Sequence, residues 1–548
     1  MSCFTRSALL EYHPICPLST VFLAILRIIL NYFCPALNIV FSCGYNYYMS
    51  IFNSKQAPDG APHPEQKPRF KGSIGRETII NIFDDCSDFQ HREIRAGLVA
   101  DKTLFVCWLD GITDGGDTAR DILRPLTDLI RSGSDPTPER LMQGAVYSAQ
   151  AQLRGDLDDV IDDICSGCVA VVFTNCAVTF ECRSKNQRGI SEPKIEKSLK
   201  GGKDCFVEIL RTNTALVRRR IYNPALKAKS LTLGRKSRTK AVIMYVDGVA
   251  DPAIIEELER RLDAVDIDGA LSSGAIEAYI TDRPRSLFPQ LLHTERPDRF
   301  AQQLLSGRVG LIVDGLPLAF MLPVTFAEFL RVPQDESQHW LVATTLSIVR
   351  WLAVMLALAL PALYVAVAMY HQEMIPTKLL MSIVASKQDV PFSTALEVIG
   401  MLLAFELLQE AGLRLPNPIS DTVSIIGALI VGQSAVEAKV ISPIAVIVVA
   451  TAGIAGYAQP SQDMSAALRV CRLALVVAAI LAGLFGVAAA LCILIWYLCT
   501  MDSYGVNYTA PLSGGRLNNL SRTFLRKPLP ERKFREPELN TPDKRRQR

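Results

Sequence analysis

Residues 341–370 read LVATTLSIVRWLAVMLALALPALYVAVAMY and decide the fold class. Arg350 is the single charge in this run, and about twenty uncharged residues follow it, enough for a helix to cross ~30 Å of hydrocarbon. Pro361 should kink that helix. A second apolar run, Val470–Thr500, has Arg472 at its entrance and should span the bilayer with tilt or protrude from it. Residues 336–502 are therefore predicted to form an α-helical, multi-span membrane domain.

Two carboxylates interrupt the apolar segment Pro391–Arg414, at Glu397 and Glu406. An ionisable group at membrane depth must face a partner or a water-filled path. The alternative is that Glu406 lies at headgroup level, at the end of a short helix. A further clear span is expected over Ile441–Gln459.

The segment Ile419–Glu437 has an apolar centre of only about ten residues, which is short for a full span. Such a segment is tolerated at membrane depth when protein buries it or when it lines a cavity. Its small residues would let helices approach closely, either in tight packing against Pro391–Arg414 or around the axis of a homo-oligomer. Its polar end could offer oxygen ligands or a ring of negative charge to cations. The candidate pore or membrane-polar residues are Glu397, Glu406, Ser424, Gly427, Gly432, Gln433 and Glu437.

The composition of the 548 residues fits a soluble part joined to a membrane part, with 49% hydrophobic and 21% charged residues. The net charge of +3 is too small to indicate nucleic acid as a partner. The 14 cysteines lack the even spacing of a secreted disulfide framework, so a reducing cytoplasm fits the soluble part.

Residues 1–72 are predicted to be an N-terminal extension and linker. The apolar stretch Pro14–Tyr48 is interrupted by Arg27 and Pro35, and Met49 opens a sequence typical of a natural start. We expect the chain to start at Met49; a real membrane anchor is the alternative. Prolines and charges make residues 53–71 a linker in either case.

The soluble part contains a repeat. Thr103–Asp114 reads TLFVCWLDGITD, Ala241–Asp251 reads AVIMYVDGVAD, and Leu311–Pro317 (LIVDGLP) is similar to both. Each reads as a strand that runs into an Asp-Gly turn. Pro252–Val265 has the start signal and the periodicity of a helix. We expect two α/β subdomains, residues 73–190 and 191–335.

Carboxylates recur at these turns, but turn chemistry explains them better than catalysis does. The sequence has no His-Glu-x-x-His, no Gly-x-Ser-x-Gly and no complete phosphate loop. Gly234–Ser237 imitates the end of a phosphate loop but fits a basic hairpin better. Cysteines 165, 168, 176 and 182 could bind zinc, although residues 169–173 and 177–180 look like paired strands. We expect no enzyme activity, no cofactor and no metal.

The chain resembles a known family over residues 80–515. In the head, the matching motifs include Leu216–Arg220, Tyr245–Gly248, Thr294–Asp298 and Val313–Pro317, and the membrane part adds Leu360–Ala366, Phe405–Leu408, Glu410–Pro416 and Val423–Leu429. The individual family-motif residues are Asn213, Arg218, Arg219, Arg220, Asp247, Gly248, Glu295, Arg296, Pro297, Asp298, Asp314, Gly315, Pro361, Pro460 and Arg469. These motifs are similar to those of the A subunit of spore germination (GerA-type) nutrient receptors and its sporulation relatives. Residues 201–206 and 335–340 depart from the family pattern.

The resemblance implies a receptor in the spore inner membrane, built with a transporter-like B subunit that senses nutrient and a lipoprotein C subunit. The A subunit would be the homo-oligomeric part through which monovalent cations leave. An accessory A-like subunit that tunes a receptor without sensing nutrient is the alternative, and a membrane transporter is another, although no repeated set of spans is visible.

The basic tail, residues 503–548, ends in the cluster Lys544-Arg545-Arg546, and positive charge places such a segment on the cytoplasmic side. The soluble head has no convincing export signal, so it belongs inside too. Both ends inside require an even number of crossings, which we expect to be four, with Ile419–Glu437 not crossing fully.

Overall fold

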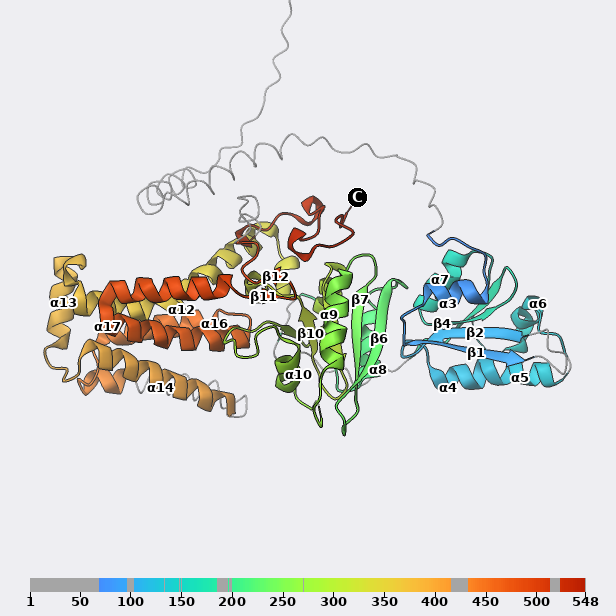
Figure 1. Cartoon of the computed structure of the whole chain (residues 1–548), viewed down its shortest axis with the longest axis horizontal. Helices are drawn as coiled ribbons and strands as arrows, with labels where there is room; N and C mark the ends of the chain where they lie inside the picture. The colour runs from blue at the N-terminus through green and yellow to red at the C-terminus, as the bar shows by residue number, and fades with distance from the viewer. Residues whose placement is uncertain are drawn as a thin grey trace, which may run out of the picture. The chain divides into compact units, whose positions relative to one another are not determined.

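The computed structural model describes residues 69–547 except for 96–102, 185–195, 197–199, 415–431 and 513–522 and positions 133, 147, 149 and 270. The expected start at Met49, and the candidate residues Ser424 and Gly427, lie outside the described residues. The described chain consists of a head with two sheets, followed by a helical part and a C-terminal segment (Figure 1).

The first subdomain is built on a five-stranded sheet of order β1-β2-β4-β5-β3. The strand bounds are β1 (Phe89–Arg95), β2 (Thr103–Leu109), β3 (Ala151–Arg154), β4 (Cys168–Val172) and β5 (Ala177–Glu181). The helices α3 (Arg76–Ile82) and α7 (Leu157–Cys165) contribute to the core on one face of the sheet. The other face is covered by α4 (Gly115–Asp117), η1 (Thr118–Leu123), α5 (Arg124–Arg131), α6 (Pro138–Arg140) and η2 (Leu141–Ala145). The expected strands at residues 169–173 and 177–180 are confirmed as the β4–β5 pair.

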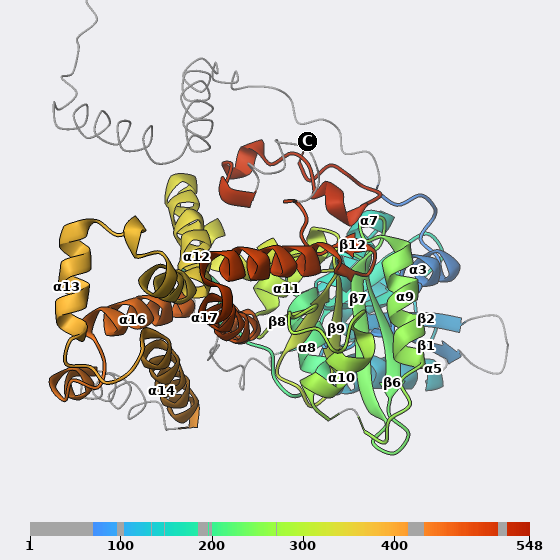
Figure 2. The same cartoon turned by 60° about the vertical axis from the view of Figure 1, so that its left-hand side comes forward.

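The second subdomain repeats this arrangement, because its sheet has the order β6-β7-β9-β10-β8. The strands are β6 (Leu226–Leu233), β7 (Thr239–Val246), β8 (Leu292–Thr294), β9 (Val309–Val313) and β10 (Ala319–Leu322). The helices α8 (Leu210–Arg218) and α11 (Pro297–Leu305) cover one face, and α9 (Pro252–Asp263) and α10 (Ser273–Ile280) cover the other. Figure 2 shows α9 lying along this sheet. Strand order and helix placement match element by element, so the head is a structural duplication.

Every pairing between the described strands of the two sheets is antiparallel. The expected α/β subdomains therefore mix helices and strands without the parallel sheet of a doubly wound fold. Alternate residues of β7 serve the two faces: Val242 and Met244 join one core, and Ile243 and Tyr245 join the other. This period of two follows from the pleat of the strand.

The repeat predicted from the sequence is confirmed at the ends of β2 and β7. Gly111 and Gly248 have φ angles of 89° and 73°, a region that glycine enters without steric cost. A second aspartate lies four residues after the aspartate of each Asp-Gly turn. Its side chain caps the next helix: Asp114 caps α4 and Asp251 caps α9. These carboxylates thus hold turns and helix starts, as predicted. Residues 234–238 connect β6 to β7 as a hairpin loop, also as predicted.

The helical part contains α12 (Trp340–Tyr370), α13 (Thr377–Lys387), α14 (Thr394–Arg414), α16 (Pro443–Tyr457) and α17 (Gln462–Cys499). Short 3-10 turns precede it at η3 (Phe326–Leu330) and η4 (Pro333–Glu336), and η5 (Gln372–Met374) lies between α12 and α13. Among the described residues, α12 and α17 are the two helices long and apolar enough to cross a membrane. α12 runs unbroken through the buried Pro361.

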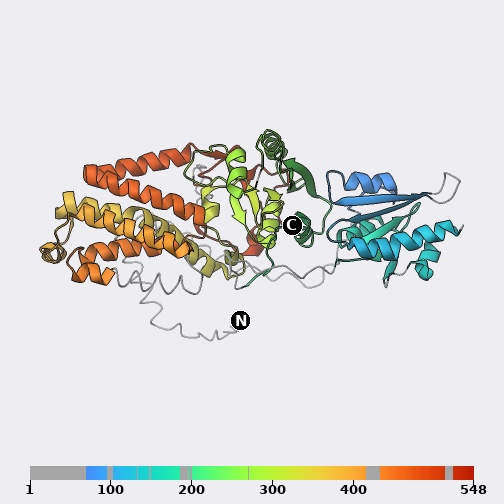
Figure 3. The same cartoon turned by 90° about the horizontal axis from the view of Figure 1, so that it is seen from below.

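α17 is not one straight rod. At Ala482 and Gly483 the backbone leaves helical geometry, and the two arms fold back on each other (Figure 3). A straight helix of 38 residues would be about 57 Å long, yet both of its ends contact residues 283–293 of the head. The prediction that Val470–Thr500 spans the bilayer with tilt or protrudes from it is therefore wrong in treating this run as one straight helix. The chain turns back at Gly483 and leaves the bundle on the side where it entered.

The C-terminal segment returns to the head. It forms the small hairpin β11 (Asp502–Ser503) and β12 (Val506–Asn507) and the turns η6 (Leu529–Glu531) and η7 (Pro537–Leu539). The hydroxyl group of Tyr508 donates a hydrogen bond to the carbonyl of Pro289. The carbonyl of Tyr508 accepts a hydrogen bond from the amide of Phe326. The end of α17 is thereby fixed to the second subdomain.

Candidate functional site: polar contacts of the helical part

Glu406 is held by two arginines of α17. Its carboxylate oxygens accept from Arg469 at 3.0 Å and from Arg472 at 2.7 Å, and Arg469 also donates to Gln409 at 2.9 Å. The side chain of Arg472 is 3% exposed. An arginine can be buried in apolar surroundings only when a carboxylate compensates its charge. Glu406 therefore faces a partner, which is one of the two alternatives that the sequence left open.

This cluster lies toward the end of the bundle that faces the head. Asp463, in the first turn of α17, has a carboxylate oxygen 3.2 Å from Nδ1 of His293. Arg472 follows nine residues later, which is about 14 Å along the helix axis. The cluster is thus nearer to the head than to the turn at Gly483.

Glu397 occupies the opposite end of α14 and is 2% exposed. One carboxylate oxygen accepts from the amide of Ser442 at 2.9 Å, and the other lies 3.3 Å from Nζ of Lys387. Ser442 caps α16, so the carboxylate also lies at the positive end of that helix. An ammonium group and a helix N-terminus thus both lie against this carboxylate.

The region between the two carboxylates is apolar. α14 and α16 run in the same direction, because Glu397 meets the start of α16 and the ring of Phe405 packs beside Gly453 further along. Val398, Leu402 and Val449 are at most 1% exposed, and they share a core with Val354 of α12 and Val476 of α17. The described hydrogen bonds and ion pairs of Glu397 and of Glu406 go to separate partners, and the residues just named form an apolar core between the two carboxylates.

The structure describes three of the five candidates that lie in Ile419–Glu437. Residues 432–437 are helical, and Gln433 and Glu437 are exposed. Gly432 is half-buried, and the methyl group Cγ1 of Val446 lies 3.8 Å from the position that a Cβ at Gly432 would take. The structure does not bring these residues together with Glu406. They lie next to α16, which starts at the Glu397 end of the bundle.

The family-motif residues of α8 hold the head together. The side chain of Asn213 accepts from the amide of Val207 and donates to its carbonyl oxygen. Arg218 donates to both oxygens of Asp88 in the other subdomain. Arg219 donates to the carbonyl of Ser184, and Arg220 pairs with Asp204. These roles are structural.

The remaining head motifs also shape the backbone. Asp247 accepts from the amide of Gly248 at 2.9 Å, and Asp314, which precedes Gly315, accepts from the amide of Leu210 at the start of α8. The carbonyl of Glu295 accepts from Phe206. Arg296 bonds Asp298 across Pro297, which opens α11. Pro460 lies in the short link between α16 and α17.

Contacts between the head and α17 were missed from the sequence. Tyr497 donates to Ser286 at 3.0 Å, and Arg283 donates to the hydroxyl and carbonyl of Thr500. Arg350 of α12 pairs with Asp335 through two bonds of 2.6 and 2.7 Å. The sequence separation of these partners, up to 217 residues, leaves no local signal. Arg350 was visible as an isolated charge, and its partner was not.

A duplicated α/β head fixed at several points to a bundle of apolar helices defines the class of this protein as a two-part chain with an α/β domain followed by a helical domain. The chain belongs to the GerA family: the family described as Bacillus/Clostridium GerA spore germination protein matches residues 77–538, which include both parts.

Several known proteins and one crystal structure are similar to this chain. Spore germination protein KA of Bacillus subtilis (strain 168) is 34% identical over 430 residues, which cover 78% of this chain and 79% of that protein. Spore germination protein B1 of the same organism is 33% identical, covering 80% and 90%. The uncharacterized membrane protein YfkQ, also from B. subtilis, is 34% identical over 86% of this chain and 92% of its own length. The crystal structure of the N-terminal domain of the A subunit of the Bacillus megaterium spore germinant receptor GerK3 is 26% identical, with a TM-score of 0.37, and covers 47% of this chain and 99% of that one.

Proposed function

We propose that this chain is the A subunit of a spore nutrient-germinant receptor, with its helical part in the spore inner membrane and with its head and C-terminal segment in the cytoplasm. It acts with a transporter-like B subunit, which senses nutrient, and with a lipoprotein C subunit. The observation that carries this proposal is the family match, because it runs from the head through the helical part to residue 538. The subunit conducts or gates monovalent cations and catalyses no reaction.

The packing of the bundle supports a cation path between copies of the chain. Both Glu397 and Glu406 are neutralised by cations of their own chain, and the side chains between them form an apolar core. A hydrated ion would lose its water there without gaining ligands. Gln433 and Glu437 are exposed, so they remain accessible to a neighbouring copy.

The links between head and bundle support a mechanical role for α17. Its first turn meets His293, its last turn meets Arg283, and its middle carries Arg469 and Arg472, which hold Glu406 of α14. A rotation of the second subdomain would therefore move both arms of α17 together. Such movement would be passed to α14 through charge-assisted hydrogen bonds.

The exposed apolar side chains of the helices support membrane insertion. Examples are Leu352 of α12, Leu407 of α14, Ile454 of α16 and Phe485 of α17, which are 58%, 72%, 69% and 79% exposed. Side chains of this size on every helix require lipid or protein neighbours.

Deletion of the gene in its spore-forming host tests the receptor role. We expect the deletion spores to lose germination with one nutrient class, and affinity purification of the tagged chain to recover B-type and C-type subunits. The accessory alternative predicts that the deletion only changes the rate of germination and that B-type and C-type genes do not lie beside this one. Full germination with every nutrient would contradict both.

A further inference from the structure

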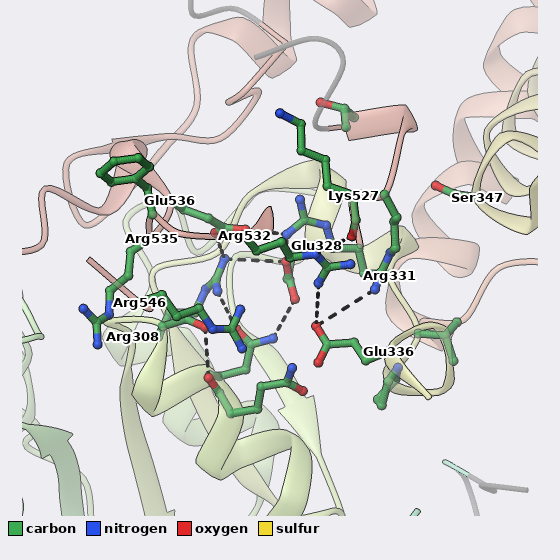
Figure 4. A pocket seen from close by; sticks show the side chains of 18 of the residues that line it. Arg308, Glu328, Arg331, Glu336, Ser347, Lys527, Arg532, Arg535, Glu536 and Arg546 are labelled. Carbon is green, nitrogen blue, oxygen red and sulfur yellow. Dashed lines mark hydrogen bonds and ion pairs between the residues drawn. The ribbon is translucent and has the colours of Figure 1, made fainter. Parts of the chain in front are cut away.

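A cavity of about 460 Å³ lies where the second subdomain, the start of α12 and the C-terminal segment meet (Figure 4). Arg299, Arg308 and the lining residues between them come from the region of α11, Ser347 comes from α12, and the remaining lining residues lie within 328–336, around η3 and η4, and within 523–546. The proposed cation path does not use this cavity.

Ion pairs fix the inner wall of the cavity. Arg308 is 2% exposed and donates to the carboxylate of Glu536 at 3.0 Å and to the carbonyl of Pro323 at 3.1 Å. Arg331 bridges Glu328 at 2.9 Å and Glu536 at 2.5 Å. Figure 4 shows these side chains converging. The C-terminal segment is thereby tied to the second subdomain, and the cavity is preformed.

The lining of the cavity carries more positive than negative charge. Nine basic and four acidic side chains line it. The buried arginines have carboxylate partners in or beside the cavity, and Arg532 pairs with Glu336 at 3.4 Å. Lys527, Lys533 and Arg546 are exposed at the wall, and none has an ion-pair partner among the described residues. The excess of positive charge therefore comes from groups that are available to a ligand.

The position of the cavity along α12 matches the level of phosphate groups in a bilayer. Ser347 lines the cavity, and Arg350, three residues later, is the last charge before the apolar stretch of α12. One turn of helix, about 5 Å, separates the cavity from that stretch. Basic pockets beside membrane helices on the cytoplasmic side are typical sites for anionic headgroups.

We propose that this cavity binds a phosphate anion, presented either as the phosphodiester headgroup of an anionic lipid or as a soluble phosphate, through Lys527, Lys533 and Arg546. Ammonium and guanidinium groups are the side chains that bind phosphate oxygens most strongly. All three side chains belong to the C-terminal segment, so a bound phosphate would hold residues 527, 533 and 546 of that segment together beside the second subdomain.

Binding to the full-length protein in a neutral detergent tests this proposal. The probes are water-soluble dioctanoyl phosphatidylglycerol, inorganic phosphate and, as a zwitterionic control, dioctanoyl phosphatidylcholine. The test variant combines Lys527→Gln, Lys533→Gln and Arg546→Gln; the matched control combines Arg92→Gln, Arg95→Gln and Arg238→Gln, three exposed cations elsewhere on the head. We expect an anionic probe to bind the wild type and the control, and to bind the test variant about tenfold more weakly or less.

The two anionic probes distinguish the possible sources of the phosphate. Binding of phosphatidylglycerol without binding of inorganic phosphate assigns the cavity to a lipid headgroup, and the reverse result assigns it to a soluble phosphate. Binding of both supports a phosphate site open to either. The proposal is overturned if no anionic probe binds the wild type, if the test variant binds as well as the wild type, or if phosphatidylcholine binds equally. Cation flux and germination do not enter this test, so it can fail independently of the proposed receptor role.

Discussion

Arg218 of α8 donates hydrogen bonds of 2.7 and 2.8 Å to the two carboxylate oxygens of Asp88, which belongs to the other subdomain. The two side chains are 2% and 10% exposed. Next to this pair, Ser87 bonds the carbonyl of Ala228 on the edge strand β6, and Cys86 forms a parallel bridge with the same residue. The duplicated subdomains are thus joined by a buried ion pair and by backbone pairing that covers a sheet edge.

Arg218→Ala should therefore destabilise the head strongly. Removing one partner leaves the Asp88 carboxylate buried without compensation, at a cost of about 3–5 kcal/mol. The measurement is the melting temperature of the full-length protein in detergent, followed by the fluorescence of its tryptophans. Arg220→Ala is the matched control on the same segment, because its pair with Asp204 is more exposed and should contribute about 1 kcal/mol or less. Equal melting temperatures for the two variants would contradict this account.

Local sequence patterns predicted the local structure of the head well. The Asp-Gly turns after β2 and β7, the helix start at Asp251 and the β6–β7 hairpin all depend on residues within a few positions of each other. The repeat of the turn motif also pointed to two similar subdomains. The antiparallel strand order could not be predicted, because it depends on pairings between strands that lie far apart in the sequence.

For the helical part, the sequence predicted that a charge at membrane depth needs a partner or water, but it did not identify which residue the partner is. Glu406 was expected to face either a partner or water, but Arg472, 66 residues later, could not be selected as its partner from the sequence. The reversal of α17 was missed for a different reason. Ala482-Gly483 lies in an unbroken apolar run, and only its excessive length and the glycines at 483 and 486 indicated that the run turns back.

The reversal predicts that residue 482 is reachable from the side of the membrane opposite to the head. In a background in which Cys492 and Cys499, both exposed on α17, are replaced by Ala, the Ala482→Cys variant should react with a membrane-impermeant maleimide added outside intact cells. The Asp502→Cys variant is the matched control, because Asp502 is exposed on the head side. It should react only after permeabilisation. Labelling of both variants only after permeabilisation would contradict the hairpin.

The orientation of the chain gives a separate prediction. Both ends of α17 contact the head, so the C-terminal segment and the head lie on one side of the bundle. With the basic tail inside, a reporter enzyme that is active only in the cytoplasm should be active when fused after Arg548. A reporter that is active only outside the cell, yet works at this position, would refute the orientation.

The attachment of the C-terminal segment should depend on pH through Glu536. Burial raises the pKa of this carboxyl, but Arg308 and Arg331 outweigh burial and lower the pKa to about 2. The pKa in the unfolded chain is about 4.3. A carboxyl whose pKa falls on folding stabilises the folded state above the unfolded value, and this contribution is lost as the pH falls from about 4.3 toward 2. The protection of residues 529–541 against hydrogen exchange, taken relative to the intrinsic exchange rate at each pH, should therefore stay high at pH 5 and fall below pH 4.

Glu536→Gln is the control for this titration. The amide cannot ionise, so Arg308 and Arg331 keep Glu328 but lose the charged partner in the C-terminal segment at every pH, and protection of residues 529–541 should already be low at neutral pH. Slow exchange in the variant at pH 7 would show that other contacts hold the segment and that Glu536 does not.

We proposed a cation path between copies of the chain, with the exposed Glu437 at its mouth. Mutation of Glu437 therefore tests that path. In liposomes that contain the full-length protein with its B and C partners, Glu437→Gln should leave assembly intact and alter the selectivity among monovalent cations, since it removes a charge at the mouth. Glu373→Gln is the matched control, because Glu373 is exposed in the turn that follows α12. The most direct measurement is the cation flux of the wild type, Glu437→Gln and Glu373→Gln side by side. The account predicts a changed flux for Glu437→Gln alone, whereas identical flux and selectivity in all three, or no flux through the assembled wild type, would contradict it.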